Sequence, residues 1–398
     1  MKEQKYKYLL PKDWKWVKLG EECNIIMGQS PPSISYNSDG IGMPFFQGKA
    51  EFTELHPIVE KWCDAPNKIA EPNDILLSVR APVGTTNIAN QKCCIGRGLA
   101  GIRYENYKYV FYFLRSIQQE LDSKGTGTTF RAISGETIRE TLFPLPPKPT
   151  QQSIVSKIEE LFSELDKGIE NLRLAQQQLK TYRQALLNTL VTDENCQTIA
   201  SVIKKLDQGW SPKCENEASM DKTEWAVIKT SAVQDGFFLE FENKRLPKEL
   251  KPREQHELKT GDILITRAGP RVRVGVCCMV RHTRPKLINC DKVYRIKVND
   301  KIVTPEYFEF ILNTPHYQDQ IERMKSGISD SGLNLTQKTF LQITIPVPTV
   351  TEQNKLVMEI ESRLSVVDKM EESITQRLQQ AESLRQSILK KAFEGRLI

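Results

Sequence analysis

The sequence predicts an α+β fold in which two tandem mixed domains alternate with two long helices. Three observations support this prediction: a series of short motifs that occurs twice in the same order, a long heptad-like apolar stripe after each copy, and short β-rich runs within each copy. The chain has 398 residues, of which 39% are hydrophobic and 27% charged, and this is enough apolar material for two or three domains.

The internal repeat consists of three motif pairs. Residues 27–31 (MGQSP) recur as 208–212 (QGWSP), and residues 73–77 (NDILL) recur as 261–265 (GDILI). A Pro-x-Pro hinge ends each copy, as FPLP in the first and IPVP in the second. Solenoid units are only about 20–45 residues long, whereas these copies lie about 200 residues apart. The repeat therefore indicates two copies of one design, a mixed domain followed by a hinge and a helix.

The helix after each hinge is predicted from apolar residues at steps of three and four. The first stripe runs from Ile154 to Leu190 and the second from Leu356 to Ala392, a pattern typical of coiled coils. At 1.5 Å per residue each helix is about 60 Å long, so its stripe needs a partner, and the nearest is the other helix. We expect an intramolecular antiparallel coiled coil that relates the two copies by a pseudo-twofold axis. The alternative is that each helix packs on its own domain.

The distribution of charge supports the same division of the chain. Residues 1–150 carry 19 basic and 16 acidic residues, and residues 198–348 carry 24 and 19, so both predicted mixed domains are basic. The predicted helical ranges are not basic, because 151–197 carry 5 and 7 and 349–398 carry 8 and 8. Within the domains we predict strands at 74–79, 262–266, 274–280 and 293–298, and short helices at 109–121 and 307–321.

Several classes of protein are excluded by composition and motifs. No run of about 18 apolar residues occurs, and the amino-terminal segment lacks the apolar core of a signal peptide, so we expect a cytoplasmic protein without membrane association. The nine cysteines form no CxxC motif, which predicts reduced core thiols. The sequence has neither the Asn/Asp-Pro-Pro-Tyr motif of amino-group methyltransferases nor a glycine-rich loop suited to S-adenosylmethionine. We expect no catalytic residue, no metal site and no bound cofactor in this chain.

The hinges and the end of the chain carry a family resemblance. The hinges run into Gln151-Gln152 and Glu352-Gln353, both copies contain an Asp-Ile-Leu strand, and residues 392–397 read AFEGRL after a helix. Together these features resemble the specificity subunit of a type I restriction-modification enzyme over essentially the whole chain. One departure is that the first hinge reads Pro-Leu-Pro-Pro and the second Pro-Val-Pro-Thr.

The resemblance implies a function for each part of the chain. Each mixed domain would be a target-recognition domain that reads one half of a split site in double-stranded DNA. The two helices would be spacers that dock two methyltransferase subunits, and motor-nuclease subunits would join for restriction. S-adenosylmethionine, ATP and Mg are then expected on those partner subunits. Two alternatives stay open: an autonomous DNA nuclease or methyltransferase, and a coiled-coil scaffold without DNA function.

Candidate DNA contacts are cationic and hydrogen-bonding side chains in loops, because phosphates attract cations and base edges require planar donors. The densest basic stretch follows the second Asp-Ile-Leu strand, where no acid occurs between Asp262 and Asp291. Glycine-containing loops ahead of both hinges are a second candidate, and a solvated loop is the alternative in each case. The predicted DNA-binding residues are Arg80, Arg97, Lys124, Thr126, Thr128 and Arg131 in the first domain and Arg267, Arg271, Arg273, Arg281, Arg284, Lys325, Ser329 and Asn334 in the second.

Overall fold

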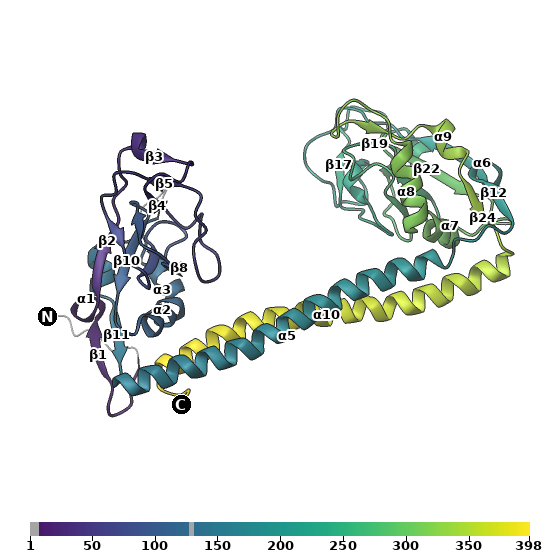
Figure 1. Cartoon of the computed structure of the whole chain (residues 1–398). Helices are drawn as coiled ribbons and strands as arrows, with labels where there is room; N and C mark the ends of the chain where they lie inside the picture. The colour runs from purple at the N-terminus through teal and green to yellow at the C-terminus, as the bar shows by residue number, and fades with distance from the viewer. Residues whose placement is uncertain (1–7, 127–130) are drawn as a thin grey trace. The chain divides into compact units, whose positions relative to one another are not determined.

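The computed structural model describes residues 8–126 and 131–398 (Figure 1). The chain divides into two units: unit 1 comprises Met1–Leu172 and Thr375–Ile398, and unit 2 comprises Arg173–Ile374. Each unit contains one mixed domain and part of both long helices, α5 (Lys148–Asn188) and α10 (Val350–Phe393). The predicted α+β class is confirmed.

Unit 1 is built on a four-stranded antiparallel sheet in the order β2-β10-β7-β8. All four residues of β7 are buried, as expected for a strand covered on both faces. A second sheet has the order β3-β5-β4-β9-β6, and β1 pairs with β11. The strands are β1 (Lys15–Lys18), β2 (Asn24–Met27), β3 (Tyr36–Asn37), β4 (Met43–Phe46), β5 (Trp62–Cys63), β6 (Ile69–Ala70), β7 (Ile75–Ser78), β8 (Thr86–Ile88), β9 (Cys93–Ile95), β10 (Leu99–Arg103) and β11 (Leu142–Leu145). The helices are α1 (Leu19–Glu22), α2 (Tyr107–Ser116), α3 (Gln118–Ser123) and α4 (Gly135–Arg139), with a 3-10 turn at Ser33–Ser35.

Unit 2 has a four-stranded antiparallel sheet of corresponding order, β13-β22-β18-β20. A three-stranded sheet has the order β17-β14-β21, and three further pairs are β12-β24, β15-β16 and β19-β23. The strands are β12 (Cys196–Thr198), β13 (Ile203–Gln208), β14 (Ala226–Ile228), β15 (Val233–Gln234), β16 (Phe237–Phe238), β17 (Asn243–Arg245), β18 (Ile263–Thr266), β19 (Ala268–Gly269), β20 (Cys277–Met279), β21 (Leu287–Ile288), β22 (Val293–Val298), β23 (Leu333–Asn334) and β24 (Thr344–Pro346). The helices are α6 (Ile199–Val202), α7 (Pro305–Leu312), α8 (Pro315–Met324) and α9 (Gln337–Leu341), with 3-10 turns at Thr230–Ala232 and Glu254–His256.

The repeated Asp-Ile-Leu motif is a tight turn followed by a buried central strand. The buried Asp74 carboxylate accepts from Glu71 N at 2.8 Å, and Asp262 accepts from Lys259 N at 2.9 Å. In each case a side-chain oxygen closes the turn before the strand, as aspartate does in many turns. The apolar residues that follow can then enter the core directly.

Each proline hinge is held between the domain and its helix by buried side-chain donors. Tyr109 donates to Pro144 O at 2.9 Å, and Tyr307 donates to Pro346 O at 3.1 Å. At the start of each long helix a buried glutamine Nε2 donates to a hinge carbonyl, at 3.0 Å for Gln151 to Pro146 and at 2.8 Å for Gln353 to Pro348. The sequence motif Pro-x-Pro followed by glutamine is therefore a structural joint.

Within each unit, segments of both long helices contribute to the domain core. In unit 1, Ile154 and Ile158 of α5 belong to the same buried cluster as Ile388 and Phe393 of α10. In unit 2, Leu186 of α5 shares a buried cluster with Val357 and Ile360 of α10. The apolar stripes are thus partly buried against the mixed domains. No helix among the described residues is long and apolar enough to cross a membrane.

The predicted element boundaries differ from the observed ones in several places. The first spacer is predicted over 151–197, but helix α5 ends at Asn188. The chain turns there, passes Asn195 with φ of 50° and enters β12. The predicted helix 307–321 is two helices, since Thr314 and Pro315 end one and begin the next. The predicted helix 109–121 is likewise interrupted, and of the predicted strand 274–280 only three residues pair.

Replacing Gly28 with alanine should destabilise the protein. A Cβ atom there would lie 2.2 Å from Gly96 O and 2.7 Å from Leu99 O, so main chain would have to move, and such overpacking costs about 1–3 kcal/mol. The measurement is urea unfolding followed by circular dichroism. Gly168→Ala is the matched control in the same unit, because no described atom lies within 4 Å of the added Cβ and alanine in a helix interior gains about 1 kcal/mol. Equal shifts for the two variants would contradict this account.

Candidate nucleic-acid interface

In unit 1, segments that are far apart in the sequence meet at one end of the central sheet, where β2 and β7 end and β10 begins. We call this end of the sheet the edge. Val79, just after β7, donates its amide to Gly98 O at 2.9 Å and accepts at its carbonyl from Ile133 N at 3.0 Å. The turn after β2 joins the same edge, because Gln29 N donates to Ile95 O at 3.0 Å. The edge therefore gathers the turn after β7, the loop before β10 and the loop before the hinge.

Two predicted DNA-binding arginines of unit 1 extend from this edge into solvent. Arg80 pairs through its main chain with Ala132, and the amide of Arg97 donates to the Ser30 side-chain Oγ, in the turn after β2, at 3.2 Å. Both side chains are exposed, and neither forms an ion pair within residues 8–126 and 131–398. They are open cations at the edge where these turns and loops meet.

The loop ahead of the first hinge offers cations that already have acidic neighbours. Lys124 Nζ lies 2.9 Å from a carboxylate oxygen of Glu120, and Arg131 lies 3.8 Å from Asp122. Thr126 exchanges main-chain hydrogen bonds with Ala132 and is exposed, whereas Thr128 lies outside the described residues. The structure thus brings Arg80, Thr126 and Arg131 to one place.

The same edge is built in unit 2 from corresponding segments. Arg267 N donates to Lys292 O at 2.8 Å, and its carbonyl accepts from Leu335 N at 2.8 Å. The Gly-x-Ser-Pro turn joins because Trp210 N donates to Asn289 O at 2.9 Å. The predicted basic stretch and the predicted loop 325–334 therefore share one surface, and β19 pairs with β23 across it.

Arg267 and Arg273 are partly buried in this surface. Arg267 Nε donates to Asp291 O at 2.8 Å, and its guanidinium lies 5.8 Å from the ring centroid of Tyr294. Arg273 Nη1 donates to Gln234 Oε1 at 3.3 Å. The hydrogen-bond partners of both guanidinium groups are neutral, so neither cation is held in an ion pair within the described part of the chain.

Arg271 is instead held by two carboxylates. Its Nε lies 3.0 Å from Asp330 and its Nη1 lies 2.5 Å from Glu322. Lys325, only 8% exposed at its side chain, is paired with Glu322 and donates to Arg271 O at 2.9 Å. These residues brace the two loops against each other, which is a structural role.

Arg281 and Arg284 also have structural roles. Arg281 makes a two-pronged ion pair with the buried Glu309 on α7, at 3.1 and 2.6 Å. Arg284 is 5% exposed, and its Nη1 donates at 2.9 Å to the main-chain carbonyls of Asp221 and Glu224. Burial lowers the pKa of the Arg284 guanidinium from its usual value. Neither cation is open to DNA, because the first is bound to a carboxylate and the second lies below the surface.

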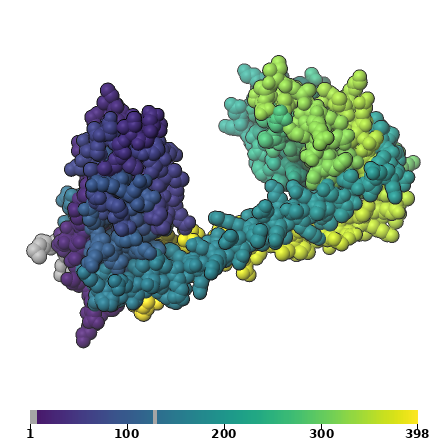
Figure 2. Space-filling view, in the orientation of Figure 1, coloured from purple at the N-terminus to yellow at the C-terminus, as the bar shows by residue number. Residues whose placement is uncertain are grey.

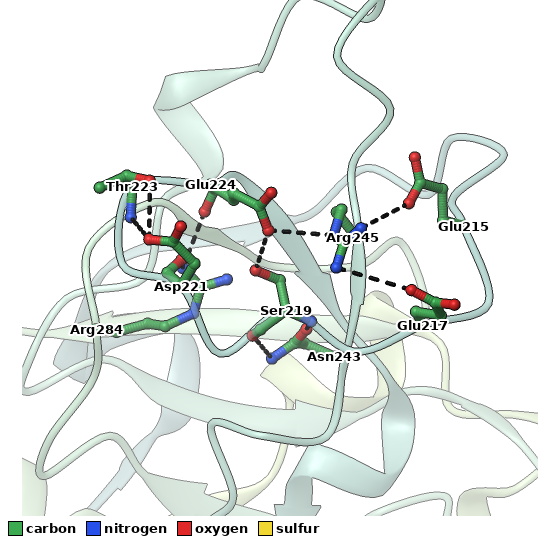
Figure 3. A network of polar contacts seen from close by, with 9 residues as sticks. All are labelled: Glu215, Glu217, Ser219, Asp221, Thr223, Glu224, Asn243, Arg245 and Arg284. Carbon is green, nitrogen blue, oxygen red and sulfur yellow. Dashed lines mark hydrogen bonds and ion pairs between the residues drawn. The ribbon is translucent and has the colours of Figure 1, made fainter.

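Figure 3 shows why the stretch around Arg284 is fixed. Arg284 supports the loop that carries Asp221 and Glu224, while the neighbouring Arg245 is surrounded by three carboxylates. The partners of Arg245 are Glu215 at 3.3 Å, Glu217 at 3.8 Å and Glu224 at 3.1 Å. The high density of arginine in the sequence therefore overstates the positive charge that this part of unit 2 presents.

The remaining predicted residues lie at the tip of the loop before the second hinge. Ser329 Oγ is 3.1 Å from Ser331 Oγ, and both side chains are exposed. Asn334 exchanges main-chain hydrogen bonds with Ser326 at 2.9 and 2.8 Å and leaves its side chain exposed. These polar groups are placed to contact a ligand at the same surface as Arg267.

The comparison of the two edges adds Asp291 to the predicted positions, because it is the counterpart of the predicted Arg97. The amide of Arg97 donates to Ser30 Oγ, and the amide of Asp291 makes the equivalent hydrogen bond to Ser211 Oγ, at 3.1 Å. One main-chain frame thus carries a cation in unit 1 and an anion in unit 2. The turns differ as well: Gln29 is exposed, whereas Trp210 is stacked by Arg253 at 4.6 Å. The repeated Gly-x-Ser-Pro turn was the only sequence signal for these pairs.

The described residues contain no group of three or more His, Cys, Asp or Glu side chains that could hold a metal ion. All nine cysteines are free thiols, and seven are buried. Burial raises the pKa of the Cys93 and Cys278 thiols to about 12, so these are unreactive core groups.

Comparisons with known proteins agree with this reading. Residues 11–173 match the family described as type I restriction modification DNA specificity domain. A Methanocaldococcus jannaschii protein named as the MjaX type I restriction enzyme specificity subunit is 42% identical over 46% of this chain and 44% of its own length. The EcoKI specificity subunit of Escherichia coli K12 is 24% identical over 98% of this chain and 90% of that protein. Residues 11–173 therefore match a type I restriction-modification DNA specificity domain, and the chain as a whole is similar to type I specificity subunits.

A solved member of the specificity-subunit family shares the fold. The HsdS subunit from Thermoanaerobacter tengcongensis is 18% identical with a TM-score of 0.59, and the match covers 98% of this chain and 99% of that one. The chain spans less than half the length of two curated relatives with 40% identity or more, which are matched over 44% and 29% of their own length.

The brace around Glu322 predicts a pH-dependent contribution to stability. Hydrogen bonds from Lys325 and Arg271 lower the pKa of Glu322. Because its folded pKa lies below its unfolded pKa, the brace stabilises the protein above the unfolded value and is lost as pH falls through the folded pKa. Glu322→Gln should therefore lower the melting temperature at pH 7 and match the parent at acid pH, in thermal unfolding scans from pH 7 to 3.

Asp319→Asn is the control for this experiment. It removes a carboxylate from the same helix, and Asp319 forms no ion pair in the described part of the chain. The control should show no comparable pH-dependent difference from the parent. A deficit in Glu322→Gln that stays constant down to pH 3 would show that the ion pairs do not carry the stabilisation.

Proposed function

We propose that this chain is the DNA-sequence-specificity subunit of a type I restriction-modification complex and reads a bipartite site, one half with each mixed domain. The observation that carries the proposal is that the same main-chain hydrogen bonds, in corresponding turns and loops, occur in both units but carry different side chains. A frame of this kind suits two half-sites of different sequence, since base readout depends on side-chain donors and acceptors. Arg97 suits guanine, and Asp291 suits the amino group of cytosine.

We propose further that α5 and α10 form an antiparallel coiled coil that sets the distance between the half-sites. Contacts inside each unit support this pairing. In unit 1, Arg385 of α10 is paired with Asp166 and lies 5.0 Å from the ring centroid of Phe162 in α5. In unit 2, Arg183 of α5 is paired with Asp368 of α10. The later part of each helix thus meets the earlier part of the other, as an antiparallel pair requires.

The partner subunits in this proposal are those that the family resemblance implies. Two methyltransferase subunits would dock on the helices, and motor-nuclease subunits would join for restriction, with S-adenosylmethionine, ATP and Mg bound on those partners. The chain itself would contribute recognition without catalysis. Methyl transfer or DNA cleavage by the purified chain alone would favour the autonomous enzyme instead.

The proposed function predicts salt-sensitive binding to two half-sites at a fixed gap. Selection from a randomised duplex library with the full chain, alone and with its methyltransferase subunits, should recover two short motifs about one helical turn apart. Affinity should fall steeply between 50 and 200 mM salt, because bound cations are released from the phosphates. Binding that is indifferent to the gap would count against bipartite reading, and no binding with or without partners would favour the scaffold alternative.

The proposed ruler makes a prediction about gap length. Deleting residues 172–178 together with 374–380 removes one heptad from each helix, about 10 Å of length. The preferred gap should shorten by about 3 base pairs, at 3.4 Å per base pair. Gly168→Ala, which changes no length, should leave the gap unaltered in the same selection. A gap that is unchanged after the double deletion would show that the helices do not set it.

A further inference from the structure

Two aliphatic side chains of unit 2 stand out in water at the DNA-facing edge. Val272 is 80% exposed and Ile328 is 108% exposed, more than any other exposed large hydrophobic residue of that unit. Each occupies the tip of one of the two loops that meet at the edge. Figure 1 shows β19, which leads into the first loop, at the end of unit 2 away from α5 and α10. In Figure 2 the light-green segment containing α8 and the second loop forms part of the surface of unit 2.

The two tips are joined to each other by direct bonds. Arg271 N donates to Asp330 O at 2.8 Å, and the Arg271 guanidinium binds the Asp330 carboxylate at 3.0 Å. Lys325 Nζ donates to Arg271 O at 2.9 Å. Val272 lies one residue from Arg271 and Ile328 two residues from Asp330, so two bonded loops carry both exposed side chains, and we call these two loop tips the projection.

Both loops are constrained by their own main-chain bonds. In the first, Arg273 N donates to Pro270 O at 2.8 Å, and Gly275, with φ of 88°, donates to Thr266 O at 2.7 Å. In the second, Gly332 N donates to Ser329 O at 3.0 Å. An apolar group held out on a constrained loop pays little conformational entropy when it is inserted into a partner.

The surroundings of the projection favour nucleic acid over an apolar protein groove. The cations Arg273, Lys292 and Arg323 lie in the same loops or directly beside them, and the last two are exposed. The carboxylates of Glu322 and Asp330 are neutralised by Arg271 and Lys325. An aliphatic tip with cations around it is how minor-groove and architectural proteins unstack a base step while holding the adjacent phosphates.

We propose that Val272 and Ile328 form a wedge that inserts between base pairs of the half-site bound by unit 2 and unstacks them. This inference rests on the proposed DNA-recognition function and adds that part of the selectivity comes from how easily a base step opens. Flexible pyrimidine–purine steps would then be preferred at the insertion point even though no base edge is contacted there.

The test uses the full chain with its methyltransferase subunits and a duplex recovered in the selection, with 2-aminopurine placed at successive positions of the unit 2 half-site. The parent should raise the fluorescence at one step. Ile328→Ser and Val272→Ser should lose that signal and bind about tenfold more weakly, and a mismatch at the same step should restore most of the affinity, because an already opened step needs no wedge. Both residues are exposed, so the variants are expected to fold.

Met220→Ser is the matched control, since Met220 is 68% exposed in unit 2 but lies outside these loops, and it should leave fluorescence and affinity unchanged. Specific binding by the parent without any fluorescence change would overturn the wedge while leaving the proposed function intact. Absence of binding by the parent would overturn both. If the serine variants keep the DNA signal but no longer bind the methyltransferase subunits, the projection is a protein-docking site and the wedge is wrong.

Discussion

The structure depends on how two proline hinges satisfy their carbonyl groups. A Pro-x-Pro segment between a sheet and a helix has few amides of its own, so its carbonyl oxygens need donors from elsewhere. The buried Tyr109 and Gln151 supply them in unit 1, and Tyr307 and Gln353 do so in unit 2. Because both donors are fixed in the core, each helix leaves its domain in a defined direction. The position of the loops at the far edge of each sheet, relative to the helix, is therefore set by the hinge.

On that scaffold, recognition is varied without changing the main chain. The glycine of each Gly-x-Ser-Pro turn lets two loops approach so closely that a Cβ at Gly209 would lie 1.9 Å from Asn289 O. Main-chain amides of these turns are already hydrogen-bonded within the protein, since Gln29 N donates to Ile95 O and Trp210 N donates to Asn289 O. The two turns therefore differ mainly in the side chains beside them, a cation at Arg97 in unit 1 and an anion at Asp291 in unit 2.

The sequence was sufficient for features that repeat or that have a strict period. The heptad stripes predict both long helices, and the Asp-Ile-Leu motif predicts the central strands β7 and β18, because burial and turn chemistry there are local. The fate of the arginines was not predictable. Arg284 is buried because Asp221 and Glu224 approach it from about sixty residues earlier, and Arg281 is bound by Glu309 of α7. Charge along a chain does not reveal which carboxylates the fold brings near, so a basic stretch can be largely structural.

This difference between sequence charge and available charge is visible when the two edges are compared. In unit 1, Arg80 and Arg97 are open, and phosphates can bind them without displacing an acid. In unit 2, the positive charge of Arg271 is offset by the carboxylates of Glu322 and Asp330. The number of arginines in a stretch is therefore a poor measure of the positive charge that its surface presents.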